Sequence, residues 1–162
     1  DGLQRVIHIG SFSKTLSAAV RCGFIAARPD WIEGLTDLKL ATSFSNGALA
    51  ARLVHRLLTD GSYRRHVEGL RGRLARAMGE TARRLGALGL VPWVEPRGGM
   101  FLWAVLPDGL DSAEVARRAL ARDVVLGDVF SPSRGAGRFL RFNVAQSANP
   151  RVFTVLEEAM RE

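Results

Sequence analysis

A lysine in a polar loop, Lys14, is the first residue of this sequence whose type suggests chemistry. The chain has 23 basic residues, but only Lys14 and Lys39 are lysines and the others are arginines. An amine, unlike a guanidinium, can lose its proton when desolvated and can then form an imine with an aldehyde. Because arginine supplies the positive charge elsewhere, a lysine in this loop indicates a need for an amine.

Two hydroxyls and an arginine accompany that amine. Ser11 and Ser13 precede Lys14, and Arg21 follows it seven residues on. Hydroxyls donate hydrogen bonds to a phosphate, and a guanidinium offers it a planar fork of donors. An imine-forming amine beside a phosphate cradle is what pyridoxal phosphate requires. The pattern S-x-S-K is short and common, so an ordinary solvated loop remains the alternative on spacing alone.

A second candidate, Arg141, lies in an apolar stretch at 139–145. Alternation with period two places Arg141 and Asn143 on one face of a strand and the apolar residues on the other. A strand arginine with an apolar face behind it can fork onto a carboxylate. The alternative is the exposed face of a half-covered sheet.

Other motifs exclude several functional classes. The histidines, His8, His55 and His66, show no metal-ligand spacing, so we expect no metal site. The hydrolase pattern G-x-S-x-G, the P-loop and the dinucleotide-binding glycine pattern are absent. Gly98 and Gly99 could bring the backbone close to a ligand, although a glycine pair between strands is more often a turn.

The composition indicates a globular domain or part of one. The chain has 162 residues, 47% hydrophobic and 24% charged, which excludes a disordered tail. Its single cysteine, Cys22, excludes a disulfide framework. No stretch approaches the length of a membrane span and no signal segment opens the chain, so we expect no membrane association and a cytoplasmic location. The chain starts at Asp1 without Met, so residues can precede it.

The net charge of +7 raises the question of a polyanionic partner. A general arginine bias explains the excess without a designed basic arm. Direct nucleic-acid binding by an arginine-rich helix at 62–88 is a weaker alternative, because Glu68 and Glu80 interrupt its basic face and no aromatic residues interleave it.

The hydrophobic pattern predicts the elements that position these candidates. β-branched residues indicate a strand at 5–10, and the apolar run at 22–27 indicates a second, buried strand. Residues 31–60 are expected to be largely helical, with Asp30 capping the start near Trp31.

A long amphipathic helix is expected next, at 62–88, closed by Gly89. Ser45 or Asn46 is expected to cap the helix before it. The remaining pattern predicts a compact two-layer α/β lobe with a mostly antiparallel sheet. Its expected elements are strands at 91–95 and 100–106, a helix at 112–122, a strand at 124–126, a loop at 131–137, a strand at 139–145 and a helix from Pro150 to the end.

Three ordered segments resemble the fold-type I, pyridoxal-phosphate-dependent aminotransferases of class I/II. They are Ser11-Phe12-Ser13-Lys14-Thr15-Leu16 with Arg21-Cys22-Gly23-Phe24, then Pro96-Arg97-Gly98-Gly99-Met100-Phe101-Leu102-Trp103, and Phe139-Leu140-Arg141-Phe142-Asn143. The resemblance covers nearly the whole chain and implies the C-terminal portion of that α/β fold. It implies the end of the large domain at 1–61, a linking helix at 62–89 and a small two-layer α/β domain at 90–162.

Within this family, segments 10–15 and 60–66 are most similar to one branch. It holds the aminotransferase-like domains of MocR-type, GntR-family regulators and aminotransferases for amino acids such as 2-aminoadipate. The resemblance therefore implies transfer of an amino group between an amino acid and a 2-oxo acid. The alternative is a domain that senses pyridoxal phosphate or an amino-acid adduct, with DNA bound only through an N-terminal domain outside this chain. A homodimer is also implied, because the active site of this family forms at a dimer interface.

The resemblance also implies a role for each candidate residue. Lys14 would form the covalent imine with pyridoxal phosphate and then move the proton between the substrate Cα and the cofactor. Ser11, Ser13 and Arg21 would hold the phosphate. Arg141 would bind the substrate's α-carboxylate as a bidentate pair.

The sequence departs from the family pattern in two places. Where the family often has a Pro-Gly pair between the lysine and the arginine, this chain has residues 17–20, Ser-Ala-Ala-Val. The family's aspartate for the pyridine nitrogen, its asparagine and tyrosine for the ring oxygen and its stacking aromatic all precede the cofactor lysine. None is found in the thirteen residues before Lys14. We therefore expect this chain alone to hold the cofactor poorly and to be inactive.

Overall fold

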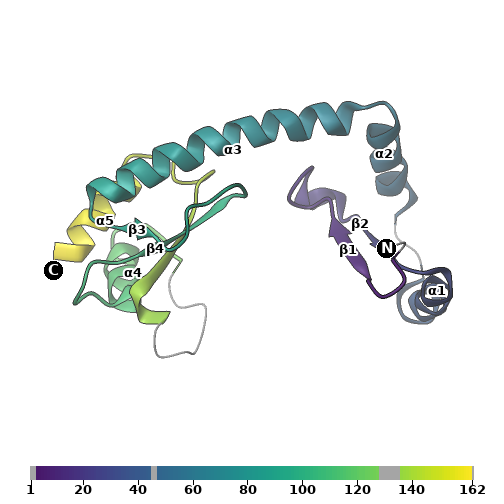
Figure 1. Ribbon diagram of the computed structural model, residues 1–162, viewed down its shortest axis with the longest axis horizontal. Coiled ribbons are helices and arrows are strands. Elements are labelled where there is room, and N and C mark those ends of the chain that lie inside the picture. Colours follow the sequence, from purple (N-terminus) through teal and green to yellow (C-terminus); the bar gives the residue numbers. More distant parts are fainter. Residues whose placement is uncertain (1–2, 45–46, 128–135, 162) are drawn as a thin grey trace. The chain divides into compact units, whose positions relative to one another are not determined.

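The structure, a computed structural model, describes residues 3–44, 47–127 and 136–161 (Figure 1). The chain forms two compact units, Asp1–Leu70 and Arg71–Glu162, and the boundary falls within one long helix. The three-part division expected from the sequence stays a prediction.

The first unit contains a two-stranded antiparallel sheet. Strands β1 (His8–Ser11) and β2 (Gly23–Ala26) pair with Ser11 opposite Gly23, so both predicted strands are confirmed in shortened form. A Cβ at position 10 would lie 2.3 Å from the Phe24 ring across the ladder, so a larger residue there requires that ring to move. The hairpin thus brings the two ends of the candidate loop together.

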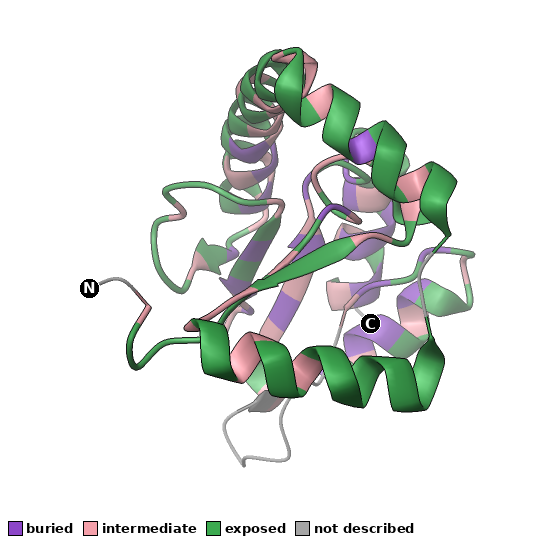
Figure 2. Cartoon of the chain, turned by 90° about the vertical axis from the view of Figure 1, so that its right-hand side faces the viewer, coloured by how far each residue is buried: buried purple, intermediate pink, exposed green. Residues whose placement is uncertain are grey.

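The expectation that the second strand is buried is wrong for this chain. In β2, Phe24 is 43% exposed and Ile25 is 45% exposed. Within the described part of the first unit, Phe12 and Val54 are the only buried hydrophobic residues. A two-stranded sheet has too little surface to cover its own apolar faces. Figure 2, coloured by burial, shows β1 and β2 without buried residues.

Helices α1 (Pro29–Ser43) and α2 (Ala48–Thr59) follow β2 and confirm the mainly helical character expected here. The first helix starts two residues before the expected Trp31, because Pro29 is preorganised for a first turn. Asp30 is therefore not the cap, and its carboxylate instead accepts a 2.7 Å hydrogen bond from Arg28 Nη2. The expected cap at Ser45 or Asn46 lies outside the described residues.

Helix α3 (Ser62–Ala87) confirms the predicted long helix almost to the residue. It begins where the Asp60 carboxylate accepts a 2.8 Å hydrogen bond from the Ser62 backbone N–H. It ends in a Schellman motif, in which Gly89 takes a φ of +81° and the N–H of Leu90 donates to the carbonyl of Leu85 at 3.0 Å. Local capping signals therefore set both ends.

The second unit is a two-layer α/β lobe, as expected. Its antiparallel sheet has the order β3 (Val91–Pro92), β4 (Phe101–Val105) and β5 (Phe139–Asn143). Helices α4 (Ser112–Leu120) and α5 (Arg151–Arg161) supply the other layer, and α3 adds Met78 and Leu85 to the same core. The elements of this unit therefore enclose a hydrophobic core of their own.

Two strand predictions in this lobe need correction. Residues 124–126 form no strand, because the Val124 N–H donates to the carbonyl of Ala119 and only Gly127 makes an isolated bridge to β5. The strand expected at 91–95 has only two residues. Part of the expected loop at 131–137 lies outside the described residues, and Ala136–Arg138 forms a short 3-10 helix, η2.

Candidate functional site

Lys14 lies in a loop that closes on its own backbone. The N–H of Phe12 donates to the carbonyl of Cys22 at 3.0 Å, which extends the β1–β2 pairing into the loop. The carbonyl of Phe12 accepts from the N–H groups of Leu16 at 2.8 Å and Ser17 at 3.2 Å. The Lys14 side chain is exposed on the resulting turn. The fold therefore presents this amine at the end of a strand.

The two predicted hydroxyls lie in the same loop. Ser11 ends β1, and its Oγ accepts a 3.2 Å hydrogen bond from the backbone N–H of Ser13. Ser13 is half-buried, one residue before Lys14. Because a hydroxyl that accepts can still donate, this contact leaves the Ser11 proton available to an anion.

Arg21 has the left-handed backbone conformation, with φ +48° and ψ +40°. This conformation costs an ordinary residue about 1–2 kcal/mol, and strain of this kind gathers at functional sites. Arg21 follows a short 3-10 helix, η1 (Ala18–Val20). Ser17 caps the start of η1, because its Oγ accepts a 3.2 Å hydrogen bond from the N–H of Ala19. These residues take the place of the family's Pro-Gly pair and carry the chain to Arg21.

Two aromatic residues, Phe12 and Tyr63, pack against each other at this loop. Phe12 is buried, and its ring meets the Tyr63 ring edge-on at a centroid distance of 5.6 Å. The Tyr63 hydroxyl donates a 2.8 Å hydrogen bond to Oγ1 of Thr15, the residue after Lys14. The sequence alone gave Tyr63 no role at this site, because Tyr63 and its partner Thr15 are 48 positions apart and no local pattern links them.

Arg141 lies in the second unit, at the centre of β5. The predicted facing is confirmed: Leu140 and Phe142 are buried, whereas Arg141 and Asn143 lie half-buried on the opposite face. Arg141 is opposite Trp103 in β4, and its N–H donates to the carbonyl of Gly127 at 2.8 Å. The strand backbone at this arginine is therefore held from both sides.

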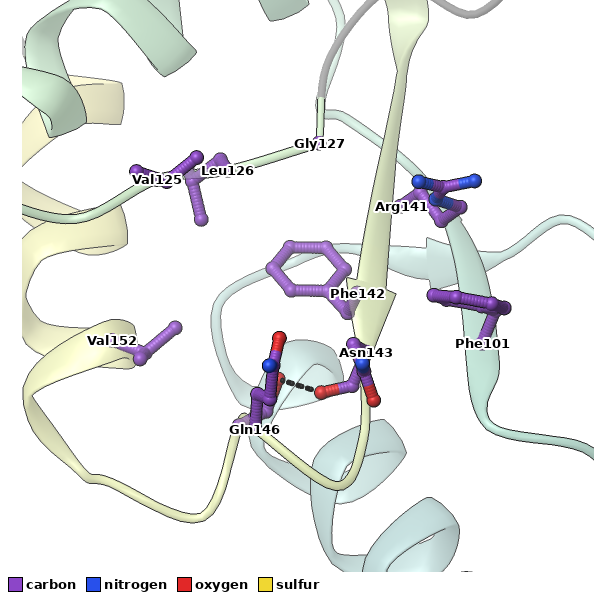
Figure 3. A pocket seen from close by; sticks show the side chains of 10 residues that line it. Phe101, Val125, Leu126, Gly127, Arg141, Phe142, Asn143, Gln146 and Val152 are labelled. Carbon is purple, nitrogen blue, oxygen red and sulfur yellow. Dashed lines mark hydrogen bonds between the residues drawn. The ribbon is translucent and has the colours of Figure 1, made fainter. Parts of the chain in front are cut away.

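A hollow of about 350 Å³ lies beside Arg141 (Figure 3). Asn143 and Gln146 provide polar groups to it, and Leu126 and Phe142 provide apolar surface. The Asn143 side chain is oriented, because its Oδ1 accepts a 3.1 Å hydrogen bond from the N–H of Ala145. An arginine and an amide at the edge of a small hollow suit a ligand that carries a carboxylate.

The loop residues fit pyridoxal phosphate by the chemistry of their donors. Two hydroxyls and a guanidinium suit a dianionic phosphate, and an exposed amine suits an aldehyde. The structure brings Ser11, Ser13, Lys14 and Arg21 into this one loop, whereas Arg141 belongs to the other unit.

Neither a metal cluster nor a membrane-spanning helix occurs among the described residues. No group of three or more His, Cys, Asp or Glu side chains there could hold a metal ion. None of the described helices is long and apolar enough to cross a membrane.

Comparison with known proteins places the fold among the fold-type I, pyridoxal-phosphate-dependent transferases. More narrowly, the chain belongs to the class I and II aminotransferase family, whose family model matches residues 1–157. The resemblance found in the sequence motifs is confirmed, including the branch that holds both regulators and aminotransferases.

Relatives of both kinds are similar to this chain. The HTH-type transcriptional regulator YdfD of Bacillus subtilis is 29% identical over 152 residues, which are 91% of this chain and 31% of the regulator. The 2-aminoadipate transaminase of Thermus thermophilus is 32% identical over 156 residues, 89% of this chain and 37% of the enzyme. The chain thus spans about a third of the length of these relatives.

Solved structures show the same fold. The α-aminoadipate aminotransferase LysN of Thermus thermophilus, solved with N-(5'-phosphopyridoxyl)-L-leucine, matches 96% of this chain with a TM-score of 0.82 and 29% identity. The kynurenine aminotransferase of Pyrococcus horikoshii matches 99% of it with a TM-score of 0.84 and 25% identity. Each match covers 42% of the solved chain.

Proposed function

We propose that this chain is the C-terminal portion of a pyridoxal-phosphate-dependent aminotransferase. The whole protein would transfer an amino group between an amino acid and a 2-oxo acid. The observation that carries the proposal is the closed backbone turn that follows β1, because its residues and the end of the strand include an amine, two hydroxyls and an arginine. Family membership supports the same reaction.

The loop residues divide the work of holding the cofactor. Ser11 and Ser13 donate hydrogen bonds to the phosphate, and Arg21 adds charge and a fork of donors. Lys14 Nζ would hold the cofactor covalently and, as the free amine, would move a proton at the substrate Cα. When bound, pyridoxal phosphate supplies the electron sink that stabilises negative charge at that carbon.

Arg141 orients the substrate in this proposal. Its guanidinium binds the α-carboxylate as a bidentate pair, which orients the Cα–H bond of the substrate. The hollow beside Arg141 adjoins this carboxylate site. The proposed protein is a homodimer, and the groups that contact the cofactor ring come from its parts outside residues 1–162. The chain alone is proposed to be inactive.

A sensor is the second candidate function, and one observation favours it. The relatives include HTH-type transcriptional regulators, among them NorG of Staphylococcus aureus, 32% identical over 78% of this chain. In that case the same residues bind pyridoxal phosphate or its amino-acid adduct, and a separate N-terminal domain binds DNA. Lys14 and Arg141 serve both functions, so turnover must distinguish them.

The experiment that tests the cofactor site uses the full-length protein. Pyridoxal phosphate is added, the mixture is reduced with borohydride, and the modified peptide is mapped by mass spectrometry. We expect the label on Lys14, and loss of the label in Lys14→Ala with folding intact. Lys39→Ala is the matched control, since Lys39 is the other lysine of this segment. A label on Lys39, or on neither lysine, would contradict the proposal.

The second experiment separates enzyme from sensor. The full-length protein loaded with pyridoxal phosphate, without borohydride, is incubated with a 2-oxo acid acceptor and an amino acid. The amino acid is 2-aminoadipate or an aromatic one, because these appear in the names of relatives. Formation of the new amino acid supports the aminotransferase. Binding of the amino acid without transfer, together with a DNA-binding segment upstream, supports the sensor.

A further inference from the structure

The Phe101 ring lies against the arginine to which we assign substrate binding. Phe101 opens β4 opposite Asn143, and Trp103 lies opposite Arg141. Phe101 and Arg141 are therefore diagonal neighbours on one face of the antiparallel pair. The Arg141 Cζ lies over the Phe101 ring, 4.6 Å from its centroid (Figure 3). This distance is within the range of a cation–π contact.

The backbone and the side chain of Arg141 are fixed by different contacts. Pairing with β4 and the hydrogen bond to Gly127 hold the backbone. An arginine side chain still has several rotatable bonds, and their freedom is lost when the guanidinium binds an anion. A ring beneath the guanidinium restricts that freedom before the ligand arrives. Preorganisation of this kind raises affinity without a new contact to the ligand.

The geometry of a guanidinium makes this support compatible with carboxylate binding. An aromatic ring attracts the cation through its own π face, whereas a carboxylate is bound by N–H groups directed along the edges of the guanidinium plane. The ring contact and the bidentate pair therefore use different parts of the same group.

We propose that Phe101 is a positioning residue that holds the Arg141 guanidinium in the orientation that receives a carboxylate ligand. This inference rests on the proposed function of Arg141. Phe101 is 43% exposed, whereas its neighbour Leu102 supplies the buried face of β4. Replacement of Phe101 therefore removes the ring contact with little loss of core packing.

The test measures amino-acid affinity in the full-length protein loaded with pyridoxal phosphate, from the change in cofactor absorbance. L-Phenylalanine and 2-aminoadipate are the carboxylate probes, and 2-phenylethylamine is the matched amine without a carboxylate. Phe101→Leu removes the ring, and Phe101→Tyr keeps it. Trp93→Leu is the control, because Trp93 lies in the same sheet region but its ring meets Phe139 at 5.2 Å.

We expect Phe101→Leu to weaken amino-acid binding about three- to tenfold, the range for loss of a partly exposed cation–π contact. Binding of the amine should not change, and both Phe101→Tyr and Trp93→Leu should bind like the parent protein. In an Arg141→Ala background, Phe101→Leu should have no further effect.

Two results overturn the inference. One is unchanged amino-acid affinity in Phe101→Leu, and the other is a loss that persists in the Arg141→Ala background. A different result tests the underlying function: if Arg141→Ala alone leaves amino-acid affinity intact, the assignment of Arg141 fails and the role of Phe101 fails with it. A normal Phe101→Leu beside a defective Arg141→Ala rejects the positioning role alone.

Discussion

The phenol of Tyr63 donates a 2.8 Å hydrogen bond to the hydroxyl of Thr15, the residue after Lys14. Tyr63 belongs to the first turn of α3, and its ring also meets the edge of the buried Phe12 ring. The loop that presents the amine is thus attached to a long helix by one polar and one aromatic contact. This attachment limits how far Lys14 can move.

Tyr63→Phe tests that attachment, because it keeps the ring and removes the hydrogen bond. We expect the free energy of unfolding to fall by about 1 kcal/mol, the typical net worth of such a bond. Cofactor labelling at Lys14 should become slower. Thr15→Val should reproduce both effects, and the double variant should add little to either single one. Additive losses in urea unfolding would show that the two residues act independently.

Replacement of Arg21 separates backbone strain from anion binding. In Arg21→Gly the backbone at φ +48° is relaxed, so stability should be unchanged or should rise by up to about 1 kcal/mol. Affinity for pyridoxal phosphate should fall about tenfold or more, because a charged hydrogen bond to the phosphate is lost. Equilibrium binding and thermal unfolding of the full-length protein measure the two quantities. Unchanged cofactor affinity would remove Arg21 from the phosphate site.

Arg141→Ala should weaken amino-acid binding about tenfold or more while cofactor affinity is kept, because the lost groups are charged donors to the carboxylate. Arg138→Ala is the matched control. Arg138 immediately precedes β5, and its guanidinium pairs with the exposed Asp108 at 2.6 Å. Titration of the loaded protein with an amino acid checks both variants. A similar loss in Arg138→Ala would point to general charge and not to a carboxylate fork.

The start of α3 should be sensitive to acid through Asp60. Hydrogen bonds from the Ser62 backbone N–H and hydroxyl, with charges of Arg65 and Arg56, hold the pKa of this carboxyl below its ordinary value of 3.8. The lowered pKa contributes stability above pH 3.8, and that contribution is lost as the pH falls through the folded pKa.

Asp60→Asn should therefore be less stable than the parent protein near neutral pH, and the difference should narrow below pH 3.8. Urea unfolding of the full-length protein across this range measures the difference. Asp37→Asn, which removes the same charge in the middle of α1, is the control for the loss of a helix carboxylate. A constant difference between Asp60→Asn and the parent would mean that the cap does not act through its charge.

Local signals predicted the elements that local forces determine. The long helix was expected at 62–88 and lies at Ser62–Ala87, because Asp60 and Gly89 cap it whatever surrounds it. The alternating pattern around Arg141 also predicted correctly which side chains face the core. Because Leu140 and Phe142 are buried on one face of the strand, Arg141 must lie on the other.

Pairing was harder to predict than burial. Val124 and Leu126 are buried and Val125 is 83% exposed, the alternation of a strand, yet these residues join no ladder. Alternation reports which side chains are covered, whereas a strand also needs a neighbour for its N–H and C=O groups. That neighbour is decided by tertiary structure, which a local pattern does not contain.

The candidate site divides in the same way. The donors of the Lys14 loop are contiguous in sequence and were predicted together. Tyr63 and Phe101 were not assigned a role, because each acts on a residue far along the chain. Their contribution depends on the register of a sheet or the first turn of a helix, so three-dimensional geometry was needed to find them.

The unequal burial of the two units has a consequence for natural variation. Positions such as Leu85 and Leu140, fully enclosed within the second unit, are constrained by the packing of this chain itself. A polar residue at Ile9 would cost this chain little, because that side chain already meets solvent. If relatives nevertheless keep an apolar residue there over evolutionary time, selection is responding to contacts with atoms outside residues 1–162. The mutational record of the hairpin would then trace a surface that this chain does not itself contain.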